Sequence, residues 1–183
     1  MGKNKAFLQV GGIPIIQRIY SVFQELFEEI LIITNETELF THLKAKIYND
    51  LIPDRGALGG LYTGLFYSSF KFSFCVACDM PFLRRSLIDF LLSKTEDYDA
   101  VVPRTLDGLQ PLHAVYSRHC LGPIKQLIDH GGLKIIDFYE NARVRVIDEI
   151  EFQSLDPGRD SFLNVNTPEE LLLLEKKQKP SFS

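Results

Sequence analysis

The stretch Phe72-Ser73-Phe74-Cys75-Val76-Ala77-Cys78-Asp79-Met80-Pro81 says most about the fold of this chain. Its first six residues are nearly all apolar, which predicts a buried strand of a parallel sheet. The strand runs directly into one carboxylate, Asp79, and Pro81 prevents the strand from continuing. Open α/β sheets bind ligands at the carboxyl ends of their strands, and Mg²⁺ takes one or two carboxylates plus substrate phosphates. Asp79 is therefore a candidate metal ligand, and a helix cap or turn residue is the alternative.

The size and composition of the chain predict one compact domain. It has 183 residues, of which 45% are hydrophobic and 24% charged. We expect this domain to cover residues 1–175, with a tail at 176–183. The net charge of −4 comes with scattered basic residues, which argues against general nucleic-acid binding. No apolar run approaches the ~18 residues of a membrane span and no secretory signal is evident, so we expect no membrane partner and a cytoplasmic location.

The cysteines Cys75 and Cys78 form a C-x-x-C pattern, which is typical of redox or zinc sites. On a strand, residues three apart point to opposite faces with Cα atoms roughly 10 Å apart, beyond the reach of a disulfide. The sequence holds no second C-x-x-C to complete a zinc site. We predict that these two residues and Cys120 are unreactive core cysteines.

Hydrophobic periodicity predicts alternating strands and helices. The expected strands are 29–34, 47–48, 72–77, 99–103, 112–116, 142–147 and a short one from Phe162. The expected helices are 13–27, 37–46, 61–69, 83–94, 118–129, 133–139 and a Leu-rich one after Pro168. Asp107-Gly108 predicts a hairpin turn before Leu112. This order favours parallel βαβ units, hence an α/β fold.

A glycine-rich loop, Arg55-Gly56-Ala57-Leu58-Gly59-Gly60, precedes the predicted helix 61–69. Glycines let the backbone approach a ligand, and a helix amino end presents unpaired N–H groups to an anion or a base edge. A simple turn is the alternative. Upstream, Asp50 is able to accept hydrogen bonds from guanine N1–H and its 2-amino group. Asn35 ends the strand 29–34 at the same expected sheet edge as Asp79, unless it is only a cap or turn residue.

The chain opens with Met1-Gly2-Lys3-Asn4-Lys5-Ala6. A doubly wound sheet normally begins with a strand and a phosphate loop before its first helix, and neither is evident here. We therefore expect the edge of a neighbouring strand to be exposed, which favours association or poorer solubility.

Together these segments resemble the molybdenum cofactor guanylyltransferases, a family of Rossmann-like nucleotidyltransferases. The resemblance covers nearly the whole chain, although the family's first strand and Gly-Gly loop are missing and Asp54 stands where Gly is more usual. The first six residues resemble the second half of the family's opening motif. The other matching segments are 12–16, 50–60, 78–81, 110–116 and 164–170.

The resemblance implies a three-layer Rossmann-like nucleotidyltransferase fold with a mostly parallel central sheet. It implies transfer of GMP from GTP to molybdopterin with release of pyrophosphate, and recipient molybdoenzymes or cofactor-insertion proteins as further partners. Asp79 would hold Mg²⁺ as the metal ligand, and Lys5 would add a second cation. The implied nucleotide-binding residues are Lys5, Asn35, Asp50, Gly56, Gly59, Gly60 and Asp79. The implied pterin-side residues are Arg104, His113, Lys134, Asn164 and Asn166.

Other interpretations remain open at this point. Taken alone, Lys5 fits a surface lysine, His113 a structural histidine and Asn166 a helix cap. A cytidylyltransferase that uses CTP is the nearest alternative activity, and a sugar-phosphate nucleotidyltransferase is a more distant one. A non-catalytic carrier of the pterin cofactor is an alternative of a different class, and the missing phosphate loop is what favours it.

Overall fold

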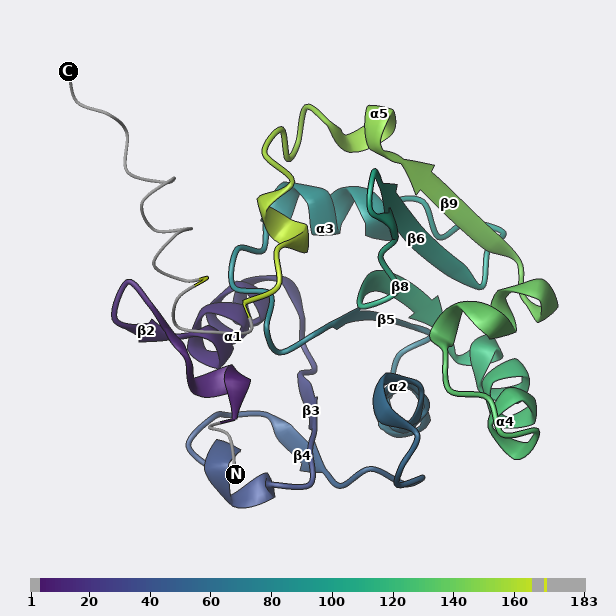
Figure 1. The fold of residues 1–183 in the computed structure, drawn as a ribbon, viewed down its shortest axis with the longest axis horizontal. Coiled ribbons are helices and arrows are strands. Elements are labelled where there is room, and N and C mark those ends of the chain that lie inside the picture. The colour runs from purple at the N-terminus through teal and green to yellow at the C-terminus, as the bar shows by residue number, and fades with distance from the viewer. Residues whose placement is uncertain (1–3, 166–169, 171–183) are drawn as a thin grey trace.

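The computed structural model describes residues 4–165 and residue 170. Figure 1 shows the course of the chain. The α-helices are α1 (Ile15–Leu26), α2 (Gly56–Tyr67), α3 (Arg85–Leu92), α4 (Leu121–Asp129) and α5 (Glu149–Phe152). The strands are β1 (Gln9–Val10), β2 (Ile13–Pro14), β3 (Leu31–Ile33), β4 (Lys46–Tyr48), β5 (Phe72–Val76), β6 (Ala100–Thr105), β7 (Gly108–Leu109), β8 (His113–Ser117) and β9 (Val144–Asp148). The 3₁₀ segments are η1 (Lys5–Phe7), η2 (Thr37–Phe40), η3 (Arg118–Cys120), η4 (Ile135–Asn141) and η5 (Asp160–Phe162).

The strands form a main sheet and two smaller ones. In the main sheet β8 pairs antiparallel with both β5 and β6, so β5 and β6 run in the same direction. After the predicted turn at Asp107-Gly108, the short strand β7 pairs antiparallel with β6 ahead of the expected partner β8, and β9 pairs parallel with β6. Strands β3 and β4 form a separate parallel pair, and β1 and β2 form a short hairpin. The predicted α/β fold with a mostly parallel arrangement is confirmed.

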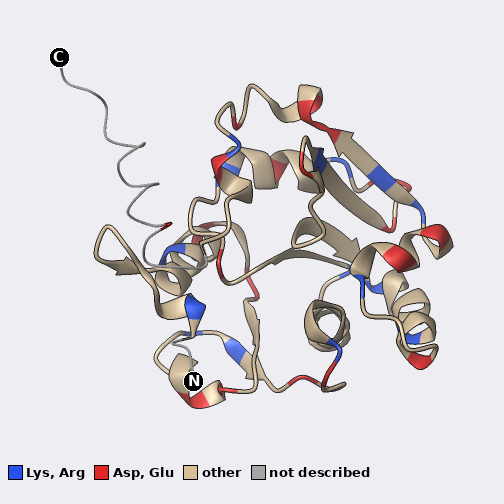
Figure 2. Ribbon diagram, viewed as in Figure 1, with Lys and Arg blue, Asp and Glu red and all other residues tan. Residues whose placement is uncertain are grey.

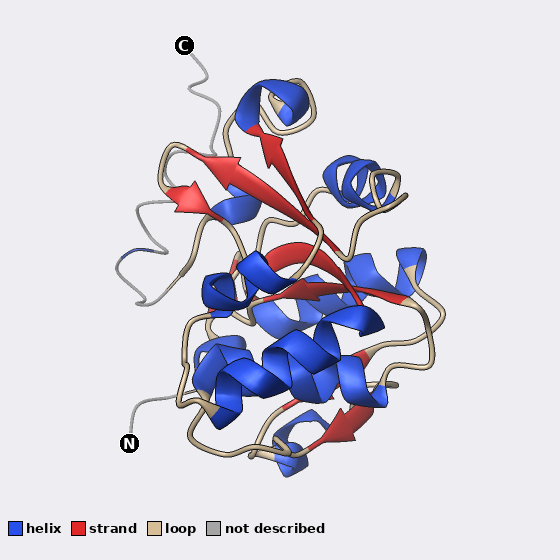
Figure 3. Ribbon diagram, turned by 90° about the vertical axis from the view of Figure 1, so that its right-hand side faces the viewer, coloured by secondary structure: helices blue, strands red, loops and turns tan. Residues whose placement is uncertain are grey.

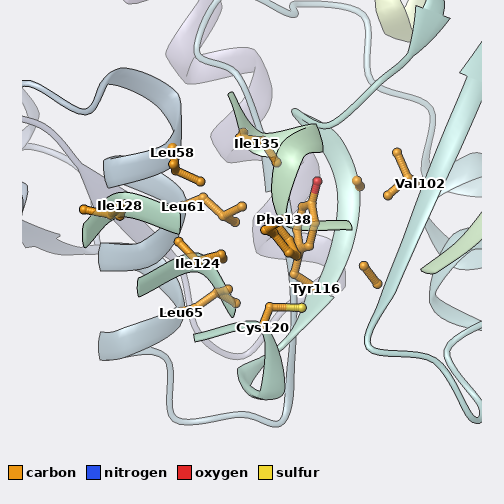
Figure 4. Packing of buried hydrophobic residues seen from close by; sticks show 12 residues of the cluster. Leu58, Leu61, Leu65, Val102, Tyr116, Cys120, Ile124, Ile128, Ile135 and Phe138 are labelled. Atoms are coloured by element: carbon orange, nitrogen blue, oxygen red, sulfur yellow. The ribbon is translucent and has the colours of Figure 1, made fainter. Parts of the chain in front are cut away.

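Helices cover both faces of the main sheet, as Figure 3 shows. Alternate strand residues point to opposite faces. Ala100 and Val102 therefore join the cluster under α2 and α4, in which Tyr116 and Phe138 are fully buried (Figure 4). Val101 points the other way, into the cluster beneath α3. The three-layer architecture thus follows from the apolar runs of the strands.

The predicted helix over 37–46 is wrong, because only the 3₁₀ segment η2 forms there. The Thr41 hydroxyl donates to the Glu38 carbonyl, which replaces a helical hydrogen bond by a local one. Phe40 and Leu43 are both buried, and Phe40 packs on Phe7 with ring centroids 5.2 Å apart. Burial of Phe40 and Leu43 favours the tighter turn over a continuous helix.

Other elements also differ from expectation. Helix α2 begins at Gly56 rather than residue 61, since burial of Leu58 and Leu61 outweighs the low helix propensity of glycine. In place of the helix predicted over 133–139, the 3₁₀ segment η4 forms over 135–141. The expected strand at Phe162 is the 3₁₀ segment η5, because the buried Asp156 carboxylate accepts the N–H groups of Asp160 and Ser161 and turns the chain.

The three cysteines are free thiols. Burial raises the pKa of Cys75 to about 12 and that of Cys120 to about 11, so both stay protonated at neutral pH. Cys78 is exposed, which corrects its prediction as a core residue. Partial desolvation of its sulfur, followed by the neighbouring Asp79 charge, raises its pKa as well.

Among the described residues, Lys and Arg are interspersed with Asp and Glu over helices, strands and loops (Figure 2). Within the described residues, no helix is long and apolar enough to cross a membrane.

Burial of His113 predicts an acid-sensitive fold. Its ring is fully buried between Phe74 and Phe162, and this burial lowers its pKa from 6.5 to about 3. Between those pH values the unfolded chain binds more protons than the folded chain, so the free energy of unfolding falls as the pH falls. We expect a loss on the order of 1 kcal/mol per pH unit from pH 6 to 4, measured by urea denaturation.

His113→Leu should flatten this slope, because it removes the titrating group and keeps an apolar side chain in the same place. His42→Gln is the matched control at an exposed histidine, and it should retain the slope. An unchanged slope in His113→Leu would assign the acid sensitivity to another group.

Candidate functional site

Asp79 lies in the turn that ends β5. The turn is closed by a hydrogen bond from the Met80 N–H to the Ala77 carbonyl, 3.3 Å long. The Asp79 side chain is 18% exposed, and its Oδ2 lies 3.9 Å from Nζ of Lys5, whose side chain is 49% exposed. A partly exposed pair at this distance stabilises the fold little. The pair therefore places a cation and a carboxylate together at this edge without being needed for folding.

Lys5 is held near Asp79 by the segment η1. The Asn4 Oδ1 accepts the Ala6 N–H at 3.1 Å, and the Asn4 Nδ2 donates to Glu36 Oε2 at 2.6 Å. Glu36 follows β3, whereas Asp79 follows β5. The carboxyl ends of β3 and β5 therefore meet at one edge, as the sequence led us to expect for Asn35 and Asp79. Nothing in the sequence indicated that Asn4 positions Lys5, except that the two residues are neighbours.

Asn35 and Asp50 lie together on the β3–β4 side of the site. The Asp50 N–H donates to Asn35 Oδ1 at 3.3 Å. The Asp50 Oδ1 accepts the Thr63 hydroxyl at 2.8 Å and the Ile52 N–H at 3.2 Å. Within the described chain no hydrogen bond reaches Asp50 Oδ2, so this oxygen is available to a ligand.

Thr63 is a residue that sequence reasoning missed. It is fully buried on α2, and its hydroxyl also accepts the Leu51 N–H at 3.0 Å, which fixes the loop that carries Asp50. The sequence signal that could have identified Thr63 is its position as a polar residue, seven after Gly56, on an otherwise apolar helix face.

The glycine loop forms the amino end of α2. The amides of Gly56, Ala57 and Leu58 make no hydrogen bond with any described residue, as expected of a helix start. At Gly59 an added Cβ would lie 2.8 Å from the Ile52 carbonyl oxygen and 2.9 Å from Asp50 Oδ2, so the close approach requires glycine. At Gly60 an added Cβ would meet open space.

Asp54 lies in the same loop and has a φ of 62°. This left-handed conformation is the one that glycine adopts without strain. It accounts physically for the expectation that Gly is more usual at this position.

Asn164 lies beside the Asp79 turn, because the Val165 N–H donates to the Asp79 carbonyl at 2.8 Å. Its side chain is exposed. Asn166 lies outside the described residues. Arg104 is exposed near the carboxyl end of β6, on the same edge of the main sheet, and its Nε donates to Asp148 Oδ1 at 2.7 Å. That hydrogen bond raises the pKa of Arg104 and lowers the pKa of Asp148.

Two of the pterin-side candidates are not brought to this edge. The His113 ring is fully buried among aromatic side chains, as in the structural alternative. Lys134 is exposed at the start of η4, which leads to the amino end of β9. The structure therefore gathers Lys5, Asn35, Asp50, the α2 amino end, Asp79 and Asn164, with Arg104 further along the edge.

The described residues contain no group of three or more His, Cys, Asp or Glu side chains placed to hold a metal ion together. Any cation at this edge would therefore have the Asp79 carboxylate as its main protein ligand and would need oxygens from its substrate.

Comparisons with known proteins identify the family. The molybdenum cofactor guanylyltransferase of Desulfosudis oleivorans is 36% identical over 171 residues, which are 93% of this chain and 85% of that protein. The "Probable molybdenum cofactor guanylyltransferase" of Pelotomaculum thermopropionicum is 37% identical over 94% of this chain and 84% of its own length.

The fold agrees with these sequence relationships. The crystal structure of molybdopterin-guanine dinucleotide biosynthesis protein A from Archaeoglobus fulgidus superposes with a TM-score of 0.83 at 23% identity, over 96% of this chain and 91% of that one. The family model described as the MobA-like NTP transferase domain matches residues 1–144. This chain therefore belongs to the family of MobA-like nucleotidyltransferases.

Proposed function

We propose that this chain transfers the guanylyl group of GTP to the terminal phosphate of molybdopterin and releases pyrophosphate. The observation that carries the proposal is the Lys5–Asp79 pair, which lies at the sheet edge shared with the α2 amino end. An anionic ligand is stabilised there by the lysine and by unpaired helix amides. Relatives that are named as guanylyltransferases support this choice of reaction.

The Asp79 carboxylate fits a magnesium ion that takes its remaining ligands from phosphate oxygens and water. It is partly exposed, and the chain offers no closed set of ligands that would favour a structural metal instead. When bound there, Mg²⁺ would supply Lewis-acid stabilisation of the charge on the phosphates.

The residues of the chain act by positioning and by neutralising charge. A phosphate oxygen of molybdopterin attacks the α-phosphorus of GTP, and the bond from that phosphorus to the bridging oxygen of pyrophosphate breaks. The phosphate nucleophile is already ionised near neutral pH, so no general base is needed. Lys5 stabilises the negative charge that builds up on the triphosphate, and the first amides of α2 add partial positive charge.

Asp50 supports the choice of guanine. Its Oδ2 is available to accept from the N1–H and the 2-amino group of the base, whereas its Oδ1 is held by Thr63 and Ile52. Cytosine has no such pair of adjacent donors, which makes CTP the poorer substrate in this proposal.

On the acceptor side, Asn164 and Arg104 are the exposed candidates beside this edge. Asn166, His113 and Lys134 remain predictions for that role from the family resemblance.

Asp79→Asn tests the proposed catalytic centre. We expect kcat for GTP-dependent guanylylation of molybdopterin to fall by about 10²–10³, because one electrostatic group of the transition state is lost. Asp129→Asn is the matched control: Asp129 is an exposed carboxylate on α4 that pairs with Lys125, and its replacement should leave kcat unchanged. Full activity of Asp79→Asn would exclude Asp79 as the metal ligand.

Gly59→Ala and Gly60→Ala test the close approach at α2. In Gly59→Ala the clash with the Ile52 carbonyl should lower stability by about 1–3 kcal/mol and weaken Mg-GTP binding. In Gly60→Ala the methyl group meets open space, and the better helix propensity of alanine should raise stability by up to about 1 kcal/mol. Thermal unfolding checks both signs; equal effects would contradict the assigned packing.

Asp50→Asn tests base selection. We expect GTP binding to weaken about 10–100-fold relative to CTP binding in calorimetric titrations, because a charged hydrogen-bond acceptor is lost. Thr63→Ala is the control for the structural role of Asp50: it should lower the melting temperature but preserve the preference for GTP. Loss of preference in both variants would mean that the loop, rather than the carboxylate, selects the base.

A further inference from the structure

Arg55 lies directly before α2 and carries a guanidinium group that no described residue binds. The residue is at the N-cap position of the helix, and its carbonyl accepts the Gly59 N–H at 3.2 Å. Its side chain is partly buried, yet within the described chain it forms no hydrogen bond or ion pair. By contrast, Arg104, Arg143 and Arg145 each bind a carboxylate. The five N–H donors of Arg55 are therefore available to a ligand.

Gly59 brings Arg55 and Asp50 together. A Cβ built on Gly59 would lie 2.9 Å from Asp50 Oδ2 and 3.0 Å from Arg55 Cβ, so these two atoms border the same point. The Asp50 carboxylate is held through Oδ1 by the Thr63 hydroxyl and the Ile52 N–H. The loop before α2 thus carries a fixed hydrogen-bond acceptor and a set of donors as neighbours.

Asp50 and Arg55 do not pair with each other, although their charges are opposite. No nitrogen of Arg55 lies within 4.0 Å of an Asp50 carboxylate oxygen. A neighbouring acid and base that leave each other unbound are suited to a ligand with donors and acceptors along one edge.

The edge of a guanine base carries the complementary pattern. Its N1–H and 2-amino groups donate hydrogen bonds, and O6 and N7 beside them accept. A carboxylate on the donors and a guanidinium on the acceptors would therefore lie next to each other in the plane of the base. Arginine fits O6 and N7 well, because its donors form a rigid planar fork. Adenine has an amino group in place of O6, and cytosine has no N7.

We propose that Arg55 is a specificity-determining residue that donates two hydrogen bonds to O6 and N7 of guanine, while Asp50 accepts from N1–H and the 2-amino group. The inference rests on the proposed function, since it takes GTP as the substrate. The triphosphate has its own cation in Lys5, which lies beside Asp79 on the other half of the site. Arg55 makes or breaks no bond of the substrate, so it acts on binding and selection.

Calorimetric titration with Mg-GTP and Mg-7-deaza-GTP tests this assignment. The two nucleotides share the ribose and the triphosphate, and the second has a C–H group in place of N7. The parent chain should bind 7-deaza-GTP about 10-fold more weakly, because a hydrogen bond to a charged donor is lost. Arg55→Met should bind GTP about 10–100-fold more weakly than the parent chain does, and it should bind both nucleotides equally.

ITP, which lacks the 2-amino group, tests Asp50 in the same series. Arg55→Met should keep the preference of the parent chain for GTP over ITP, because Asp50 is intact. Asp50→Asn should reduce that preference and keep the preference for GTP over 7-deaza-GTP. Each variant should thus affect one preference and leave the other.

Arg85→Met is the matched control. Arg85 is an exposed arginine of α3 that pairs with Glu25 and Asp89, and its replacement should leave every Kd unchanged. Thermal unfolding checks the fold of Arg55→Met: its melting temperature should stay within about 2 °C of the parent value, because the guanidinium binds no described residue. The preference of the parent chain for GTP over 7-deaza-GTP needs no variant and tests the N7 contact directly.

Three outcomes would overturn the inference. Equal binding of GTP and 7-deaza-GTP by the parent chain would mean that N7 is not read. A preference that survives in Arg55→Met, with both nucleotides weakened equally, would place Arg55 at the triphosphate instead. Absence of Mg-GTP binding by the parent chain would overturn the proposed function as well, whereas the first two outcomes leave that function standing.

Discussion

The described chain builds the candidate site from two sheets that share no hydrogen bond with each other. The β3–β4 pair carries Asn35, Asp50 and the loop that leads to α2. The main sheet carries Asp79. The N–H of Val165, the neighbour of Asn164, donates to the Asp79 carbonyl. The distances across the site therefore depend on the contacts that hold these halves in register, namely Glu29 with Ser69 at one end and η1 at the other.

Lys5 gains its significance from this arrangement. An exposed lysine at 3.9 Å from a carboxylate adds little to folding, because water screens the charges. In the proposed reaction the same lysine would face a triphosphate beside a helix amino end, and water would screen its charge less once substrate covers it. The placement of η1 by the Asn4–Glu36 hydrogen bond is thus a condition for charge neutralisation, although it joins residues that never touch the substrate in this proposal.

Features encoded locally could be predicted from sequence. The apolar run before Asp79 and the proline after it specify a strand and its end, and the turn at Asp107-Gly108 specifies the hairpin. Features that depend on distant partners could not. The bridge from Thr63 to Asp50, the turn imposed by Asp156 on η5 and the burial of His113 against Phe162 all join segments whose proximity only the folded chain creates. Propensity failed at Gly56 for the same reason, because tertiary burial of α2 outweighed it.

Helix α2 links the two regions that the structure sets apart. Its amino end presents amides to the candidate site, its Leu58, Leu61 and Leu65 face lies in the core, and Gly60 and Gly64 line a cavity that α1, β3 and β5 also border. These are three sides of one rigid body, so a change in the packing of one side is felt by the others. Adjacent glycines consequently meet different constraints: Gly59 is enclosed by the Asp50 loop, whereas Gly60 borders open space. The geometry of the candidate site therefore depends on how α2 packs on its other two sides.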